Sequence, residues 1–216
     1  MKGLLRVVCC WSMLLVAIVG SSQTAPDYTL QGNKLVRKGG TGYEVSVATS
    51  LKYVGVKRFH IREAADAEQH IFATADSSGR VERLVWVQFE QQLPGQNWQY
   101  DYPSPERIKL GDLEFIADWH AFRSYAGQPP GVDHAKMDDL LAEHKLRFDG
   151  PVIAIRMVHL PDKERRRELM IIYVESLPKS EETKFGVFDE DAAKWPKELA
   201  KLKANAMRDL QVRAMK

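Results

Sequence analysis

Apolar side chains fill every position of two short runs in this chain. The first run is Leu84 to Val87, and the second is Leu169 to Val174. An antiparallel strand usually leaves one face in water, so a run that is apolar on both faces indicates a strand covered on both sides. The two runs therefore predict a pair of neighbouring strands at the centre of a sheet, with protein on each face.

Alternation of apolar and polar residues extends this prediction to further strands. The predicted strands are residues 43–47, 53–62, 69–75, 80–90, 151–160 and 168–177. Between the third and fourth strands, Asp76-Ser77-Ser78-Gly79 is typical of a hairpin turn, because glycine supplies a positive φ. Short turns between consecutive strands favour an antiparallel meander.

A helix is predicted to begin at Asp112, a suitable N-cap residue. Four apolar side chains follow at helical spacing: Phe115, Ile116, Trp119 and Phe122. The same segment also alternates in part, so a strand from Leu113 to Phe122 is the alternative.

Two further helices have clearer patterns. The second begins at Asp133 and turns Met137, Leu140 and Leu141 inward before it ends near Leu146. The third is an amphipathic helix over residues 191–216. Its apolar stripe consists of Trp195, Leu199, Leu202, Ala206 and Leu210.

These elements predict an α+β fold, an antiparallel sheet of five to seven strands with two or three helices packed mainly on one face. Residues 26–216 are expected to form a single domain. Residues 26–41 are polar and rich in glycine, and are expected to be a flexible lead-in arm, with one short strand allowed at residues 34–36.

The first 25 residues are expected to be a signal peptide. Lys2 and Arg6 precede an apolar run over residues 7–20, and a small polar segment follows it, with cleavage between Ser21 and Pro26. The alternative is an uncleaved anchor, but the run is shorter than the roughly 20 residues that a membrane-spanning helix needs. The protein is therefore expected to be secreted or periplasmic, with no stable membrane span after cleavage.

Removal of the leader changes the composition in two ways. Cys9 and Cys10 are the two cysteines of the chain, so the mature protein is expected to be free of disulfides. The chain has 31 Lys and Arg against 29 Asp and Glu, and both Lys2 and Arg6 leave with the leader, so the mature chain is neutral. Neutrality argues against nucleic acid as a partner, since nucleic acid selects a basic surface.

Sequence motifs for known chemistries are weak. There is no G-x-S-x-G motif, and the glycine-rich residues 39–42 lack the Lys-Ser/Thr of a phosphate loop. No two histidines have the H-x-x-x-H spacing of a helical metal site. The nearest approach is His134 and Asp138 on one predicted helix with Asp118 and His120 on another. We therefore predict no metal and no cofactor, and assign no catalytic residue.

The best candidate for a binding site follows the first central strand. Trp98, Tyr100 and Tyr102 alternate with amide and acidic residues, and Glu90 and Gln92 lie where that strand ends. Amphipathic rings among amide groups are typical of ligand clefts, although rings of this density also belong to cores. A carboxyl beside aromatic rings is expected to have a raised pKa. These five residues are the predicted ligand-binding set.

The sequence thus favours an exported, soluble binding module that holds a small molecule or a partner segment at an aromatic loop over a curved sheet. Two alternatives stay open. One is a secreted hydrolase or isomerase that uses Glu90 or His120. The other is a cell-envelope structural or assembly protein, which would dock a protein partner through a strand edge or the C-terminal helix.

Overall fold

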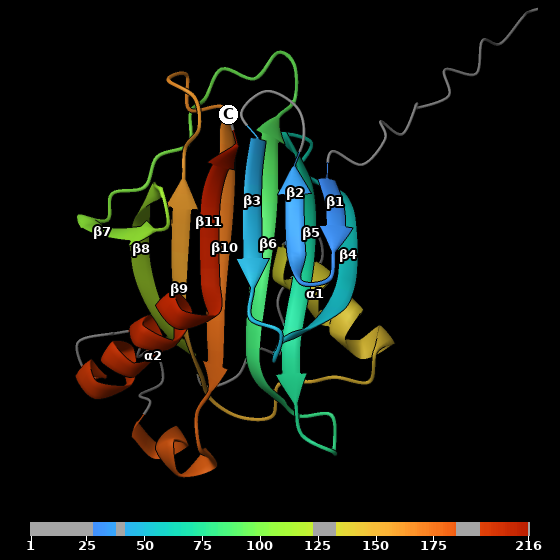
Figure 1. Ribbon diagram of the computed structural model, residues 1–216, viewed down its shortest axis with the longest axis vertical. Coiled ribbons are helices and arrows are strands. Elements are labelled where there is room, and N and C mark those ends of the chain that lie inside the picture. Colours follow the sequence, from blue (N-terminus) through green and yellow to red (C-terminus); the bar gives the residue numbers. More distant parts are fainter. Residues whose placement is uncertain (1–27, 38–41, 123–132, 185–194, 216) are drawn as a thin grey trace, which may run out of the picture.

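A computed structural model describes residues 28–37, 42–122, 133–184 and 195–215. Its strands form two antiparallel sheets that lie one over the other, with helices α1 and α2 beside them (Figure 1). The proposed leader, residues 1–25, lies outside the described part of the chain.

The larger sheet has seven strands in the order β4-β5-β6-β10-β9-β8-β7. In this order they are β4 (Lys52–Ile61), β5 (Ala65–Ala75), β6 (Val81–Gln92), β10 (Arg167–Ser176), β9 (Val152–His159), β8 (Leu113–Phe122) and β7 (Glu106–Leu110). The two apolar runs lie on β6 and β10, which pair directly. The prediction that these runs form neighbouring central strands is therefore confirmed.

The smaller sheet joins the two ends of the described chain. Its order is β1 (Tyr28–Gln31), β2 (Lys34–Arg37), β3 (Gly42–Val47) and β11 (Leu210–Met215). The register between β3 and β11 runs from Val47 opposite Leu210 to Gly42 opposite Met215.

This sheet corrects two predictions. The lead-in arm is not a flexible arm where it is described, because β1 and β2 pair with each other and β2 pairs with β3. The C-terminal helix does not reach the end of the chain, because α2 (Pro196–Asp209) stops before β11. Leu210 fits the helical stripe, but it and Val212 are buried while Gln211 and Arg213 are exposed, which is the alternation of a strand.

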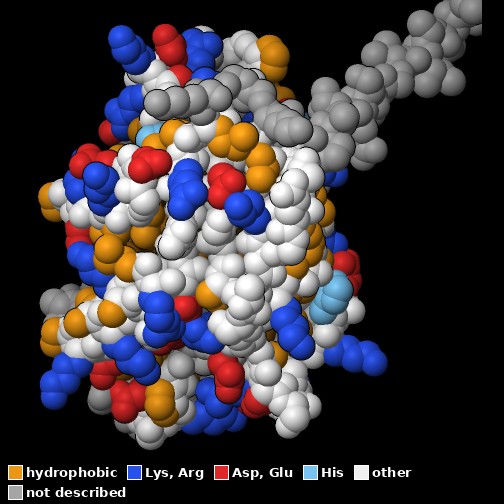
Figure 2. Space-filling model, viewed as in Figure 1, with side chains coloured by type: hydrophobic (Ala, Val, Ile, Leu, Met, Phe, Trp, Pro, Cys, Tyr) orange, Lys and Arg blue, Asp and Glu red, His pale blue; other side chains and the backbone are white. Residues whose placement is uncertain are grey.

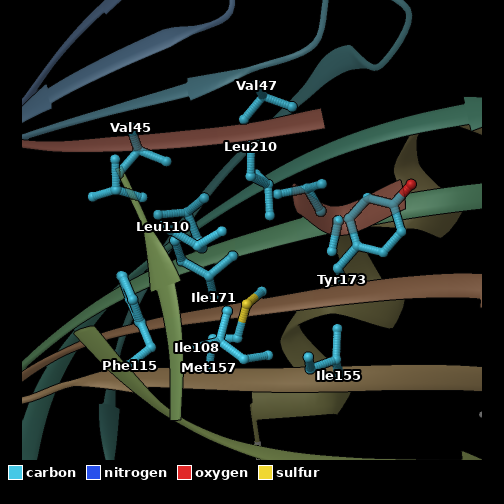
Figure 3. Packing of buried hydrophobic residues seen from close by; sticks show 14 of the residues in the cluster. Val45, Val47, Ile108, Leu110, Phe115, Ile155, Met157, Ile171, Tyr173 and Leu210 are labelled. Carbon is cyan, nitrogen blue, oxygen red and sulfur yellow. The ribbon is translucent and has the colours of Figure 1, made fainter. Parts of the chain in front are cut away.

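The main core lies between the two sheets (Figure 3). In this view Val45 and Leu210 of the smaller sheet lie on one side of the core, and Phe115, Ile155 and Ile171 of the larger sheet belong to the same core. Helix α2 adds Leu202 and Ala206 to the same core. Its proline, Pro196, stands in the first turn, where the missing N–H leaves no hydrogen bond unmade.

The opposite face of the larger sheet is covered by α1 (Asp133–Glu143). Met137, Leu140 and Leu141 of this helix pack in a second cluster that includes Trp86. The prediction that the helices pack mainly on one face is wrong for the described helices, because α1 and α2 join cores on opposite faces of the larger sheet. Trp86 and its neighbour Val85 face opposite sides, and both are fully buried.

Strand β8 corrects the first predicted helix. Phe115, Ala117 and Ala121 turn toward the core between the sheets, whereas Asp118 and His120 turn to the other face. Alternation therefore prevails over helical spacing in this segment, and pairing with β7 and β9 satisfies its backbone. A short 3₁₀ helix, η1 (Lys179–Lys184), follows β10.

The visible surface has mixed charge. Lys and Arg side chains are interspersed with Asp and Glu over the face that carries the smaller sheet (Figure 2). None of the helices within the described ranges is both long and apolar enough to cross a membrane.

Candidate ligand-binding site

A row of polar side chains interrupts the apolar face that the larger sheet turns toward α1. On β6, Gln88 and Glu90 follow Trp86 at alternate positions. Gln69 of β5 lies opposite Gln88, and Glu168 of β10 lies opposite Glu90. All four polar residues are buried. Buried polar groups are costly unless they are hydrogen-bonded, so this row needs partners.

Gln88 is the centre of those hydrogen bonds. Its Oε1 accepts from the indole Nε1 of Trp86 at 2.8 Å and from Nε2 of Gln69 at 3.3 Å. Its Nε2 donates to Glu90 Oε1 and, at 3.0 Å, to Asp133 Oδ2. Gln69 Nε2 also donates to the Asp133 carbonyl at 3.1 Å. The first turn of α1 is therefore bonded directly to the centre of the sheet.

Glu90 and Glu168 form a carboxyl pair. Burial, together with the neighbouring charge of Glu90, raises the pKa of Glu168 to about 9. Burial also raises the pKa of Glu90, although its hydrogen bond from Gln88 opposes that rise. Glu168 therefore keeps its proton at neutral pH, and it is hydrogen-bonded to Glu90.

Two tyrosines cover this pair. The hydroxyl of Tyr100 donates to Glu90 Oε2 at 2.9 Å, and that of Tyr102 donates to Glu168 Oε2. The loop that carries them is fixed by the backbone N–H of Tyr100, which donates to the Arg165 carbonyl at 2.9 Å. Each tyrosine therefore satisfies one oxygen of a different carboxyl group.

The five residues predicted as a ligand-binding set lie together. Besides the contacts of Tyr100, Tyr102 and Glu90, the side-chain amide of Gln92 donates to the Trp98 carbonyl at 2.7 Å. The Trp98 ring meets Tyr100 edge-on with ring centres 4.7 Å apart, and it is 37 % exposed. The expected rise in the Glu90 pKa is confirmed in direction.

A cavity of about 150 Å³ lies beside this network, between α1 and the sheet. Its lining residues come from β6, β8, β9, β10 and α1: Trp86, His120, Asp133, His134, Ala154, Arg156, Met170 and Ile172. Trp86, Ala154, Met170 and Ile172 are buried, whereas the side chains of His120 and Arg156 are each about a third exposed. The cavity thus has an apolar floor and a polar rim that reaches solvent.

The rim is organised by Asp118. Its carboxylate accepts from Arg156 through Nε at 3.0 Å and through Nη2, and it lies 3.1 Å from His120 Nε2. Burial alone would raise its pKa, but the hydrogen bonds from His120 and Arg156 outweigh burial and lower the pKa to about 2. The Arg156 guanidinium also lies 5.3 Å from the centre of the Tyr102 ring. Tyr102 therefore links the rim to the carboxyl pair.

The histidines considered for a metal site lie around this cavity. His120 on β8 and His134 on α1 both line it, and the His134 ring meets Trp86 edge-on with ring centres 5.4 Å apart. Burial lowers the pKa of His134, and the nearby charges of His120 and Arg156 lower it too. Within the ranges that the structure describes, no group of three or more His, Cys, Asp or Glu side chains is placed to hold a metal ion.

A larger hollow of about 410 Å³ lies on the surface, where the turn between β7 and β8 meets α2 and β11. It is lined partly by Lys109, Met207, Gln211 and Arg213. None of the buried polar residues of the larger sheet reaches it. We therefore place the candidate site at the smaller cavity, where buried polar side chains converge.

Sequence reasoning missed four residues of this site: Gln69, Asp133 as a wall residue, Arg156 and Glu168. Glu168 stands directly before the second apolar run, and the pairing of the two runs was predicted. Only their register, Glu168 opposite Glu90, brings the two carboxyl groups together. Arg156 stands out in the sequence as a charged residue within an apolar strand, which is the signal that would have marked it.

Comparison with known proteins adds no assignment. No protein-family model, curated protein or solved structure matches this chain. The chemistry of the cavity and of the buried network beside it is therefore the ground for a functional proposal.

Proposed function

We propose that this protein binds a small molecule in the cavity between α1 and the larger sheet. The observation that carries the proposal is the placement of a 150 Å³ cavity directly beside the buried network of Gln88. Burying the polar side chains of this network costs free energy, because they lose their hydration, so apolar side chains in their place would suffice to stabilise the fold. Their concentration beside one cavity supports a role in recognition.

The composition of the walls supports binding. Apolar side chains form the floor, and a few polar groups converge from separate elements, as in most small-molecule sites. The volume suits a ligand of about one ring, because an apolar cavity of about 150 Å³ accommodates benzene. The partly exposed side chains of His120 and Arg156 mark the entrance.

The aromatic loop supports the site from one side. Tyr102 lies under Arg156 of the rim, and its hydroxyl is bonded to Glu168. Tyr100, Gln92 and Trp98 lie further out and hold the loop in place. In this proposal the five residues predicted from the sequence position the wall of the cavity, and Trp86 and Asp133 contact the ligand.

An acid–base enzyme is less well supported. Glu90 does not line the cavity, and both of its carboxylate oxygens accept hydrogen bonds from protein groups. His120 does line the cavity, but its Nε2 lies against Asp118. An assembly role for α2 is also weaker, because its apolar residues Leu202 and Ala206 are buried in the core.

Export remains part of the proposal on sequence grounds. The charged and apolar pattern of residues 1–25 supports a cleaved leader and a secreted or periplasmic binding protein. Intact-mass measurement of protein purified from its own host would locate the cleavage site and, under native conditions, detect a bound small molecule.

The binding proposal is tested by filling the cavity. Ala154 lies on its floor, so Ala154→Leu places a larger side chain in the empty volume and is expected to abolish binding of ring-sized compounds in an NMR titration. Ala73→Leu is the matched control, because Ala73 is buried in the same cluster but does not line the cavity. It should keep binding, although overpacking costs about 1–3 kcal/mol of stability. Undiminished binding by Ala154→Leu would refute the proposal.

A further inference from the structure

We infer that the cavity selects a small organic cation, a ring compound that carries an ammonium group. The inference rests on the proposed function and adds the charge of the ligand to it. Three independent features carry it: the charge of the cavity wall, a buried acceptor that has no donor, and aromatic rings beside that charge.

Asp133 gives the wall its charge. Arg156 is balanced by Asp118 through two hydrogen bonds, so this pair contributes little net charge to the cavity. Asp133 accepts a hydrogen bond from Gln88, but within the described ranges it forms no ion pair. An unpaired carboxylate in a partly enclosed wall attracts a cation more strongly than it would in open water.

The groups behind Asp133 reinforce this charge. Gln88 connects Asp133 to Glu90, and the charge of Asp133 contributes to the raised pKa of Glu90, so the two carboxyl groups interact. An anionic ligand would therefore meet repulsion from the wall, whereas a cation would meet attraction.

Gln69 supplies the independent second observation. It is fully buried, and its Oε1 has no hydrogen-bond donor within the described part of the chain. Rotating the amide group would not help, because Nε2 already donates to Gln88 Oε1 and to the Asp133 carbonyl. Gln69 does not line the cavity but lies directly behind Asp133, so the network behind this wall has more acceptors than donors, and its unbalanced oxygen adds to the negative potential on the Asp133 side.

Aromatic rings complete the recognition of a cation. Trp86 lines the cavity, and indole rings bind cations more strongly than other side-chain rings. Tyr102 already holds the Arg156 guanidinium over its face at the edge of the site. A ring-sized body therefore fits the apolar floor while its ammonium group lies toward Asp133.

The test compares three probes of nearly equal shape: benzylammonium, benzyl alcohol and benzoate. Binding to the full chain is followed by NMR at about pH 8, where imidazole groups are ordinarily neutral. Benzylammonium is expected to bind at least about tenfold more tightly than benzyl alcohol, and benzoate more weakly than both. Asp133→Asn keeps an acceptor for Gln88 and should reduce the preference for the cation to less than about twofold.

Asp139→Asn is the matched control, because Asp139 is exposed on the same helix and does not line the cavity. It should keep the full preference. If benzoate or benzyl alcohol binds as tightly as benzylammonium, or if Asp133→Asn leaves the preference intact, the ligand class is wrong while small-molecule binding stands. If none of the three probes shifts the signals of the cavity residues, the inference and the proposed function both fail.

Discussion

Glu90 and Glu168 face each other across β6 and β10, and Glu168 keeps its proton at neutral pH because burial and the charge of Glu90 raise its pKa to about 9. The acceptor role belongs to Glu90, which receives hydrogen bonds from Gln88 and Tyr100. Glu168 is the protonated partner and accepts the Tyr102 hydroxyl on Oε2. The two carboxyl groups are therefore chemically unequal, although the sheet places them symmetrically.

This inequality predicts opposite effects for two matched substitutions. Folding at neutral pH requires Glu168 to take up a proton, because its pKa rises from 4.5 to about 9. The amide of glutamine at this position can donate a hydrogen bond to Glu90 without taking up a proton from solution. Glu168→Gln is therefore expected to stabilise the protein by about 1–3 kcal/mol at pH 7. Glu90→Gln leaves a single oxygen for the two donors Gln88 and Tyr100, so one of them loses its acceptor, and the substitution should destabilise by about 1–3 kcal/mol.

The pH dependence separates this explanation from a packing effect. A carboxyl group with a raised folded pKa contributes stability that is complete below its ordinary pKa and is lost as the pH rises toward the folded value. The advantage of Glu168→Gln should therefore be small near pH 4.5 and grow toward pH 9 in thermal melts. An advantage of equal size at every pH would contradict a proton held on Glu168.

Trp86 and Trp98 provide a comparison of a buried and an exposed ring. Trp86 is fully buried at the centre of the sheet, and its indole N–H is bonded to Gln88. Trp86→Ala is expected to cost about 3–5 kcal/mol in urea unfolding, the usual range for a core aromatic. Trp98→Ala, at an exposed position, should cost less than about 1 kcal/mol. Equal losses would show that the loop around Trp98 belongs to the core.

His70 predicts a loss of stability in acid. It is fully buried between the sheets, where Nδ1 lies 3.1 Å from the Tyr53 hydroxyl and Nε2 lies 3.1 Å from Glu68. Burial lowers its pKa, and although the hydrogen bond to Glu68 opposes this, the folded pKa stays below the ordinary value of 6.5. A lowered histidine pKa contributes stability above pH 6.5 that is lost as the pH falls.

The measurement compares melting temperatures at about pH 7 and pH 5. His70→Gln should show a smaller loss between these pH values than the wild-type protein, because its side chain does not titrate. His60→Gln is the control, since His60 is more than half exposed at the outer strand β4. If His60→Gln reduces the decrease in melting temperature between the two pH values and His70→Gln does not, protonation of the buried His70 is not the cause of that decrease.

The sequence predicted the structure well where the pattern of apolar residues matches the burial of the strand on each face. The runs on β6 and β10 are apolar on both faces because α1 covers one side of the sheet and the smaller sheet covers the other. It was misleading at β8, where Phe115, Ile116 and Trp119 stand at helical spacing and the segment alternates only in part. The segment forms a strand because it pairs with β7 and β9, and the sequence of the segment alone does not contain these pairings.

The second sheet and the cavity depended on contacts between distant segments. β11 pairs with β3 from the other end of the chain, so local pattern predicted strands at 34–36 and 43–47 but could not reveal that they belong to a second sheet. The aromatic loop was identified because its rings alternate with polar residues within a few positions. Arg156 and Asp133 were not identified, because they join the site only when β9 and the start of α1 come together in the folded protein.

Gly111 fixes the contact between the two sheets. It has φ +58° in the turn between β7 and β8, and a Cβ atom there would lie 2.0 Å from the Val212 carbonyl oxygen of β11. The next N–H, that of Asp112, donates to the same carbonyl at 3.3 Å. The turn therefore touches β11 so closely that no side chain fits between them.

Gly111→Ala is compared with Gly32→Ala to measure this contact. Both glycines have similar positive φ values, but a Cβ atom at Gly32 would meet nothing within 4 Å. Gly32→Ala should therefore cost about 1–2 kcal/mol for the backbone conformation alone. Gly111→Ala should cost at least about 2 kcal/mol more, because β11 has to move away from the turn. If both substitutions reduce the free energy of unfolding in urea by the same amount, β11 moves away from the turn without a loss of stability. Ligand affinity should be unchanged in the folded Gly111→Ala protein, because the cavity lies on the opposite face of the larger sheet.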